Sequence, residues 1–409
     1  MNIIKYLSWF AIFFILHYIE GFPSIAGFSV AQLWKLPLIV YLLLNAIQSR
    51  CNTFRFEKYG YYYSSFPFLS LDILQTPLNV LLFSIKQLPV ILFFRFWQRF
   101  KKETLVKVLI ILSQFICLAS FLTLTNIVQP VKRYLSAESF IEGQSYYSSV
   151  FGSPHAASSY FCVASLVLIY FLINRHFVST INKIYNIILL CVGVYSLFLS
   201  YTRTGWIMFI ISLLFIVNFK KINLKKKFCF FFILIIGGIG IVSLYNNNDA
   251  FRLRISGGGQ YKGESSSLID TEGSGRTDFW KNGIELWADS DLYCFLLGSG
   301  TRAVVDNNKV KTGMSVGSHS LFVDTLAKYG LVTFVLLILF FYYQYRFIIS
   351  IGRGSPYQSL CKSLLIGSIL FAFFQGEIYF DYAVIYSIAL VLMYKTNYKL
   401  NENIIYRTM

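Results

Sequence analysis

The chain is a series of apolar segments separated by short polar turns. About ten segments are strongly apolar and long enough to cross roughly 30 Å of hydrocarbon as helices. They span residues 3–19, 30–48, 78–96, 108–128, 156–173, 184–200, 205–219, 228–245, 331–345 and 363–375. Two segments are weaker, Tyr61–Gln75 and Ala383–Tyr394. The first is short and contains Pro67 and Asp72, so a re-entrant piece is the alternative to a span there. The pattern predicts an all-α polytopic integral membrane protein with about 12 transmembrane helices.

Composition agrees with this class. Of the 409 residues, 56% are hydrophobic and only 13% are charged, which is far from the composition of a soluble domain. Lys5 precedes the first apolar segment, as in a signal sequence, but no small-residue cleavage pattern follows it. The first segment is therefore expected to remain as a membrane anchor.

Basic residues decide the expected orientation, because cytoplasmic loops collect Lys and Arg. Every second loop is basic, from Lys5 through the clusters Arg95–Lys107 and Lys220–Lys227 to Lys395 and Arg407. Both termini are therefore expected in the cytoplasm. The formal net charge of +17 is divided among these short loops and forms no single patch, so no nucleic-acid partner is expected.

Three regions follow from this layout. Residues 1–245 are expected to form about nine transmembrane helices. Residues 246–320 form a large, partly helical external loop, and residues 321–409 form the C-terminal transmembrane helices and a cytoplasmic tail. The first part of the loop, Asn246–Glu272, lacks apolar periodicity and is predicted to be an irregular flap. The chemistry is expected in this external loop.

Two arginines in external turns are candidate anion ligands. Arg203 lies in the turn Thr202–Gly205 between two apolar segments, where it is either an interfacial anchor or a bidentate phosphate ligand. Arg276 precedes an amphipathic helix that Thr277 is expected to cap and that is predicted to lie on the membrane surface. The free N–H groups of that helix start would favour an anion beside Arg276, although a solvated arginine is an equal alternative.

His319 is the candidate base. It stands at the start of an apolar helix on the external side, where the positive end of the helix dipole would keep the imidazole neutral. A purely structural histidine is the alternative reading of this residue alone. Asp324, about one helical turn later, is a candidate to orient the imidazole. No motif with metal-ligand spacing and no nucleophile elbow is present, so neither a metal nor a cofactor is expected.

The spacing around His319 resembles that of a known family. His319 and Ser320 are followed by nine residues, Gly330, two more residues and Thr333. This arrangement is similar to the histidine motif of O-antigen ligases and of the related O-antigen and capsule polymerases. Further family-like features are Thr202-Arg203-Thr204-Gly205, Arg276 with Trp280, Gly298-Ser299-Gly300 and Phe151-Gly152-Ser153-Pro154-His155. The resemblance covers about residues 145 to 335.

The resemblance implies a metal-independent glycosyltransferase of the bacterial inner membrane that uses a polyprenyl diphosphate-linked oligosaccharide on the periplasmic face. His319 would be the base, and Arg203 and Arg276 would hold the leaving diphosphate. The residues expected to contact substrate are Arg252, Arg254, Trp280, Arg302 and Asp324. The expected partners are the lipid bilayer and the chain-length regulator and flippase of the same pathway. Inversion by direct displacement is expected, because no carboxylate pair for a covalent intermediate stands out.

Three functions remain open at this stage. A polymerase is favoured, because the chain is rich in Ile, Phe, Tyr and Lys and carries a serine-rich flap, as expected of a protein matched to one repeat unit. A ligase that transfers the glycan to lipid A core is the main alternative. A polysaccharide flippase is less favoured, because it would need charged residues along several helices.

Overall fold

The computed structural model describes residues 3–21, 30–48, 53–131, 147–174, 176–177, 179–216, 242, 246–247, 276–376 and 379–397. Within these ranges every regular element is a helix, so the predicted all-α class is confirmed there. The predicted span 228–245 and the flap Asn246–Glu272 fall almost entirely outside the described residues.

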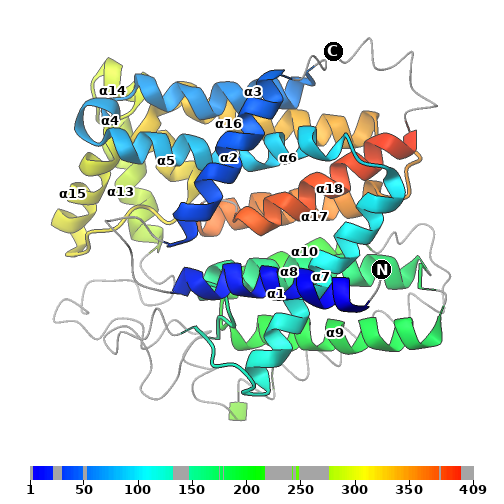
Figure 1. Cartoon of the computed structure of the whole chain (residues 1–409). Helices are drawn as coiled ribbons and strands as arrows, with labels where there is room; N and C mark the ends of the chain where they lie inside the picture. The colour runs from blue at the N-terminus through cyan, green and yellow to red at the C-terminus, as the bar shows by residue number, and fades with distance from the viewer. Residues whose placement is uncertain are drawn as a thin grey trace.

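The described helices follow the apolar pattern closely (Figure 1). They are α1 (Ile3–Tyr18), η1 (Ile19–Gly21), α2 (Val30–Gln48), α3 (Arg55–Ser65), η2 (Phe66–Leu69), α4 (Asp72–Gln75), α5 (Pro77–Gln87), α6 (Pro89–Trp97), α7 (Lys102–Leu124), α8 (Pro154–Ile173), α9 (Thr180–Leu199), α10 (Arg203–Ile216), α13 (Arg276–Ala288), α14 (Leu292–Leu297), α15 (Gly300–Thr312), α16 (Leu321–Ser350), α17 (Gln358–Phe374) and α18 (Phe380–Asn397).

Five described helical segments are long and apolar enough to cross a membrane. They are Pro77–Trp97, Lys102–Leu124, Pro154–Ile173, Thr180–Leu199 and Leu321–Ser350. Four shorter apolar helices accompany them, at Ile3–Tyr18, Leu33–Gln48, Arg203–Ile216 and Gln358–Phe374. The chain is thus a multi-pass helical membrane protein, whereas the total of about 12 spans stays a prediction.

Helices α8 and α18 form the centre of the bundle. Residues on all sides of both helices are buried, which explains why their sequences are apolar throughout and show no polar face. Helix α8 begins at a well-formed N-cap, because the Ser153 side chain accepts a hydrogen bond from the Ala156 N–H at 3.1 Å and Pro154 occupies the first helical position.

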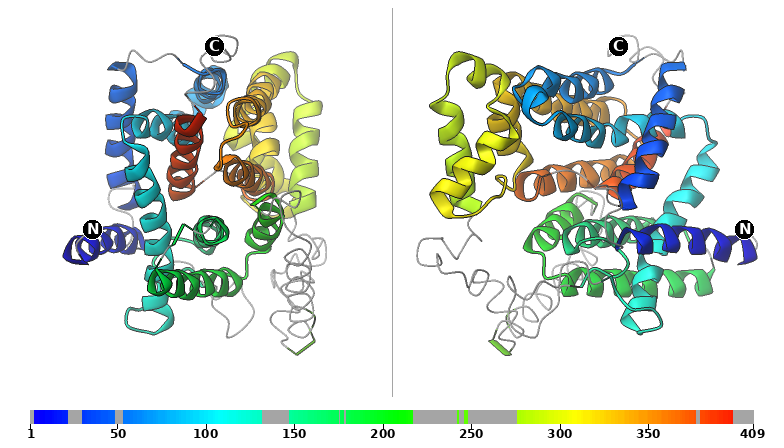
Figure 2. Two further views of the ribbon diagram at one scale, coloured as in Figure 1. Left: turned by 90° about the vertical axis from the view of Figure 1, so that its right-hand side faces the viewer. Right: turned by 60° about the vertical axis from the view of Figure 1, so that its left-hand side comes forward.

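The helices of the loop region gather at one end of the bundle. In both Figure 1 and the right-hand view of Figure 2, α13, α14 and α15 lie beside the start of α16, and the start of α1 lies at the opposite end. The contact between α14 and α16 depends on two glycines. A Cβ atom on Gly330 would lie 2.3 Å from the Leu296 carbonyl oxygen, and one on Gly298 would lie 2.1 Å from the Lys328 carbonyl oxygen.

Gly330 also breaks the regular path of α16. Its φ of 78° and ψ of 177° are non-helical, and the helix kinks there. The Ser299 N–H donates to the Ala327 carbonyl oxygen at 3.0 Å, so α14 is joined to α16 on the N-terminal side of the kink. The glycine in the predicted histidine motif therefore has a structural role, because it admits the end of α14.

A buried group of charged side chains fastens the N-terminal helices to α18. Lys35 Nζ lies 2.8 Å from Glu20 Oε1, and the two ring nitrogens of His17 lie 3.4 Å from Glu20 and 3.4 Å from Asp381. His17 is only 2% exposed and Glu20 only 6%. Since a buried ion is costly without its partner, this group makes the packing of α1, α2 and α18 interdependent.

We expect Glu20→Gln to destabilise the fold by about 3 kcal/mol, because Lys35 then keeps a half-buried charge without its carboxylate. The double variant Glu20→Gln/Lys35→Met should recover part of this loss. Thermal unfolding of the purified protein in detergent measures both effects. A double variant that is less stable than Glu20→Gln alone would show that the two side chains do not act as a pair.

Candidate active site

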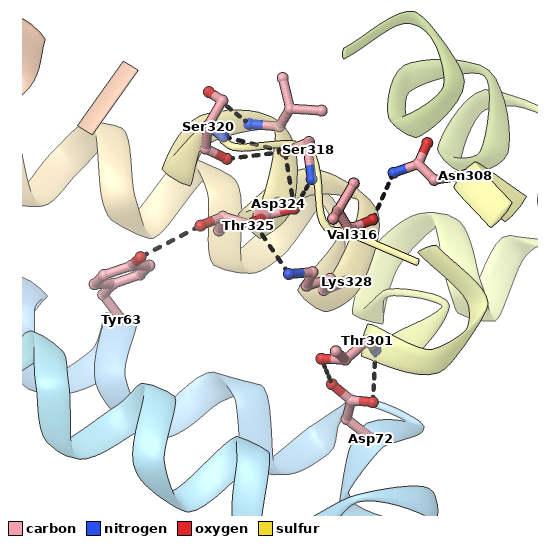
Figure 3. A network of polar contacts seen from close by, with 11 residues as sticks. Tyr63, Asp72, Thr301, Asn308, Val316, Ser318, Ser320, Asp324, Thr325 and Lys328 are labelled. Carbon is pink, nitrogen blue, oxygen red and sulfur yellow. Dashed lines mark hydrogen bonds and ion pairs between the residues drawn. The ribbon is translucent and has the colours of Figure 1, made fainter. Parts of the chain in front are cut away.

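The segment that carries His319 is held by short polar contacts. The Ser318 N–H and hydroxyl both donate to Asp324 Oδ1, at 2.9 and 2.8 Å (Figure 3). Ser320 is the N-cap of α16, and its side chain accepts from the Val323 N–H. Between them His319 has a φ of +55°, which is uncommon for a residue with a side chain. The chain therefore turns sharply at His319, immediately before α16.

Helix α15 is hydrogen-bonded to the residues just before His319. Asn308 is fully buried, donates to the Val316 carbonyl oxygen at 2.9 Å and accepts from the Asn282 side chain at 3.2 Å. At the start of α15, the buried Asp72 carboxylate of α4 accepts from the Thr301 N–H at 2.6 Å and from its hydroxyl (Figure 3). A carboxylate is favourable at a helix start, so α4 fixes α15 to the bundle.

Helix α13 packs directly on the start of α16. The buried Phe279 ring lies 6.0 Å from the His319 ring, centroid to centroid. Gly283 allows this approach, since a Cβ atom there would lie 2.8 Å from Val323 Cγ1. Helix α13 begins at Arg276, one residue before the expected cap Thr277, so Arg276 belongs to the first turn of the helix.

Arg276 reaches from α13 to the start of α10. Its Nη1 donates to the Thr204 hydroxyl at 3.4 Å. The same hydroxyl accepts from Gln375 Nε2 at 3.4 Å, and Gln375 Nε2 also lies 2.9 Å from His155 Nδ1. The starts of α8, α10 and α13 are thus connected through side chains at the end of α17. Helix starts carry partial positive charge and free N–H groups, so their convergence beside two arginines favours a bound anion.

The charges around His319 lower the pKa of its imidazole below the ordinary value. Burial is the largest cause, and the positive charges of Arg276 and Lys328 act in the same direction, whereas Asp324 opposes them. The His319 residue nevertheless remains exposed to solvent. The ring is therefore both neutral at pH 7 and accessible, as a proton acceptor must be. The sequence pointed to the helix dipole as the cause, but burial and neighbouring charges contribute directly.

The structure brings two of the predicted catalytic residues together, since the charge of Arg276 acts on the His319 ring. Arg203 opens α10 and is half-buried, with Thr204 next to it in contact with Arg276. Gly205 lets α10 pack closely on α8, because a Cβ atom there would lie 2.7 Å from Ser158 Cβ. The Thr-Arg-Thr-Gly turn therefore combines a cationic side chain with close helix packing.

The predicted substrate contacts have more varied surroundings. Asp324 bonds Ser318 and lies 3.0 Å from Lys328 Nζ, and no described hydrogen bond joins it to the imidazole. It positions the residue before His319 and not the ring itself. Trp280 packs on Phe373 and Phe374 at the end of α17.

Arg302 is 74% exposed at its side chain and lies 3.5 Å from Asp306, on the surface of α15. Arg252 and Arg254 lie outside the described residues. Substrate binding by all five predicted contact residues stays a prediction.

Sequence reasoning did not place His155 and Gln375 in the site. A signal for His155 was available, because Ser153 and Pro154 mark a helix start on the expected external side. Gln375 lies at the end of an apolar segment, and nothing in its local sequence connects it to residues more than 150 positions away. In the part of the chain that the structure describes, no group of three or more His, Cys, Asp or Glu could hold a metal ion.

The match to a known family covers most of this region, but not His155 or Gln375. Residues 187–338 match the family model described as O-Antigen ligase. The matched span contains Arg203, Arg276, His319 and Gly330, so the resemblance to the O-antigen ligase and polymerase family is confirmed over this segment. No curated protein matches the chain at a significant level.

The lowered pKa of His319 predicts an imidazole that stays neutral below about pH 6.5, the ordinary midpoint for histidine. The rate of acylation by diethyl pyrocarbonate, which modifies the neutral ring, should therefore fall only at lower pH than in a free histidine peptide. Mass spectrometry of the modified protein measures this titration. Lys328→Gln should move the midpoint upward, because it removes a neighbouring positive charge, whereas the exposed control Lys281→Gln should not. A midpoint above that of the peptide would contradict this interpretation.

Proposed function

We propose that this protein is an O-antigen or capsular polysaccharide polymerase, a metal-independent inverting glycosyltransferase acting on polyprenyl diphosphate-linked repeat units. The observation that carries the proposal is the meeting of two arginine-bearing helix starts with a histidine whose pKa is lowered. The family match agrees with a glycan substrate on a polyprenyl carrier in a membrane setting.

The arginine-bearing helix starts suit the leaving group of the donor. A diphosphate carries several oxygens with negative charge, and a guanidinium can bind two of them in parallel. Arg276 and the neighbouring Arg203 would hold the diphosphate against the N–H groups of α10 and α13. Because these donors are fixed by helix packing before substrate arrives, they would stabilise charge on the leaving group without rearrangement.

His319 would act on the acceptor. The acceptor hydroxyl attacks the anomeric carbon of the donor sugar, its proton passes to the neutral imidazole, and the bond between that carbon and the diphosphate oxygen breaks. The products are a new glycosidic bond, the polyprenyl diphosphate and an imidazolium that returns its proton to solvent. Attack from the side opposite the leaving group inverts the configuration at the anomeric carbon.

The orientation belongs to the same proposal. The starts of α10 and α13 and His319 would face the periplasm of a bacterial inner membrane, with both termini in the cytoplasm. Helices α6 and α18 end on the side of the bundle away from α13 to α15 (Figure 1). Arg95 lies in the last turn of α6 and Lys395 in the last turn of α18, which supports this assignment. A flippase that supplies the carrier lipid and a chain-length regulator would be the partners.

A ligase is the second candidate function, and the description of the matching family favours it. The two enzymes share the donor and differ in the acceptor, which is another lipid-linked glycan for a polymerase and lipid A core for a ligase. We favour the polymerase because of the Ile, Phe, Tyr and Lys-rich composition and the serine-rich segment before α13, which suit a protein matched to one repeat unit.

Replacing His319 by Ala should lower the rate of glycan extension about 100- to 10,000-fold, because the acceptor loses its base. The measurement is extension of purified polyprenyl diphosphate-linked repeat units by purified protein in the presence of a metal chelator, where the wild type should remain active. His176→Ala is the matched control, since this exposed histidine lies between α8 and α9, far along the chain from the site. Full-length ladders from the His319→Ala protein would sink the assignment.

Deletion of the gene in a Gram-negative host separates the two enzymes. A polymerase mutant should carry single repeat units on lipid A core, because ligation continues without extension. Electrophoresis of the lipopolysaccharide and extraction of the carrier lipid measure this directly. If long glycan accumulates on the carrier lipid and none reaches lipid A core, the ligase assignment is correct instead.

A further inference from the structure

A cavity of about 280 Å³ lies between the start of α3 and the end of α16. Its lining includes Phe54, Arg55, Tyr343, Arg346 and Phe347. The two helices pack side by side (Figure 1). Helix α16 is long enough to cross a membrane, and His319 comes just before its first turn. The cavity is therefore expected at the opposite membrane face from the candidate active site.

The floor of this cavity is apolar. Phe54 is only 5% exposed and Phe347 only 6%, and their rings meet edge to face with 5.0 Å between centroids. The buried Phe56 ring contacts both of them, at 6.2 and 5.0 Å between centroids. Because these three rings hold one another in place, the floor exists before a ligand arrives. It suits hydrocarbon and not a charged group.

Two exposed arginines form part of the cavity rim. Arg55 Cζ lies 5.9 Å from the centroid of the Tyr343 ring, and Arg346 Nη1 donates to the Tyr342 hydroxyl at 3.4 Å. Both guanidinium groups are thus restrained by uncharged tyrosines. A guanidinium has five N–H donors in one plane, so most of them stay available for the oxygens of a phosphate.

The charge of the rim favours an anion. Among the described residues, neither Arg55 nor Arg346 forms an ion pair with an acidic side chain. Glu57, the acidic residue nearest to Arg55 in the sequence, is 1% exposed and lies 2.7 Å from Arg95 Nε. An anionic phospholipid offers both a phosphate for the rim and hydrocarbon for the floor, whereas a soluble phosphate offers only the first.

We propose that this cavity binds an anionic phospholipid, with its phosphate on Arg55 and Arg346 and the upper part of an acyl chain on Phe54 and Phe347. The position agrees with such a ligand, because tyrosines and basic residues at the ends of membrane-spanning helices lie at the level of the lipid headgroups. The site is separate from the candidate active site and does not depend on the proposed reaction.

A lipid at this place would join α3 to α16 at the end away from His319. The two helices already approach closely, since a Cβ atom on Gly60 would lie 2.8 Å from Phe340 Cε2. At the other end of α3, the Tyr63 hydroxyl lies 3.3 Å from the Thr325 hydroxyl (Figure 3). Lipid binding should therefore stabilise the pair of helices that positions the start of α16.

The test compares two lipids with the same acyl chains, dioleoyl phosphatidylglycerol, which is anionic, and dioleoyl phosphatidylcholine, which has no net charge. Native mass spectrometry of the purified full chain in detergent measures the binding of each. We expect phosphatidylglycerol to bind more tightly. Arg55→Gln and Arg346→Gln should each weaken its binding about fivefold, which is the contribution of one basic side chain near a lipid phosphate.

Two further variants separate the cavity from general surface charge. Arg353→Gln is the matched control, because this exposed arginine lies in the turn after α16 and outside the cavity lining, and it should bind phosphatidylglycerol like the wild type. Ser350→Phe keeps both rim arginines and fills part of the cavity, so it should weaken binding.

Four results would overturn the proposal. They are equal binding of the two lipids by the wild type, an equal loss in Arg353→Gln, unchanged binding in Ser350→Phe, and displacement of the lipid by inorganic phosphate in large molar excess. The second would indicate general attraction to a basic surface, and the third would place the lipid outside the cavity. The fourth would show that the site takes a soluble phosphate instead of a lipid.

Discussion

The close approach of two backbones at Gly298 and Gly330 is the contact on which the site depends. Neither position has room for a Cβ atom, since a side chain would meet the carbonyl oxygen of the facing helix at close to 2 Å. This contact packs the end of α14 against the kink in α16. Helices α13 and α15 are held near the same place, because short turns join them to α14. The distance between Arg276 and His319 is therefore determined by helix packing, although the two residues are 43 positions apart in sequence.

Packing of this kind also brings positively charged groups close to one another. The starts of α8, α10 and α13 meet near two arginines and a lysine, and each helix start contributes about half a unit of positive charge. Among the described residues, Asp324 is the acidic group whose charge opposes them at His319. A bound diphosphate would be stabilised beside these positive groups. The stability of the bundle, with buried contacts such as Lys35 with Glu20, holds the positive groups together.

The sequence predicted the single helices better than their assembly. The apolar segments 156–173 and 184–200 agree with α8 and α9 within a few residues, because each is a long run whose pattern is local. The segment 78–96 was predicted as one helix, but the structure divides it into α5 and α6 at Leu88, where Pro89 lacks the N–H needed to continue. That proline was visible in the sequence, and its effect was missed because the apolar run continues through it.

For the candidate site, too, the sequence predicted the single residues better than their arrangement. The sequence could identify Arg203, Arg276 and His319, since each stands at the start of a predicted helix. The free N–H groups and the dipole of a helix start favour an anion there, and they favour a neutral imidazole. The proximity of their helices could not be derived. It depends on Gly205, Gly283 and Gly298, whose lack of a side chain matters only when the facing helix is known. His155 and Gln375 were missed for this reason, as their partners lie on other helices.

The placement of His319 beside cations bears on how the proposed reaction would proceed. An imidazole with a lowered pKa is a weak base, and the neighbouring Arg276 makes the protonated ring still less favourable. When the bond to the donor sugar breaks, however, negative charge would appear on the diphosphate that Arg276 is proposed to hold. That charge offsets the guanidinium and stabilises the imidazolium, so the base becomes stronger as the leaving group departs. Proton removal from the acceptor hydroxyl would then be favoured only while the donor is being cleaved. Before that, the hydroxyl would keep its proton.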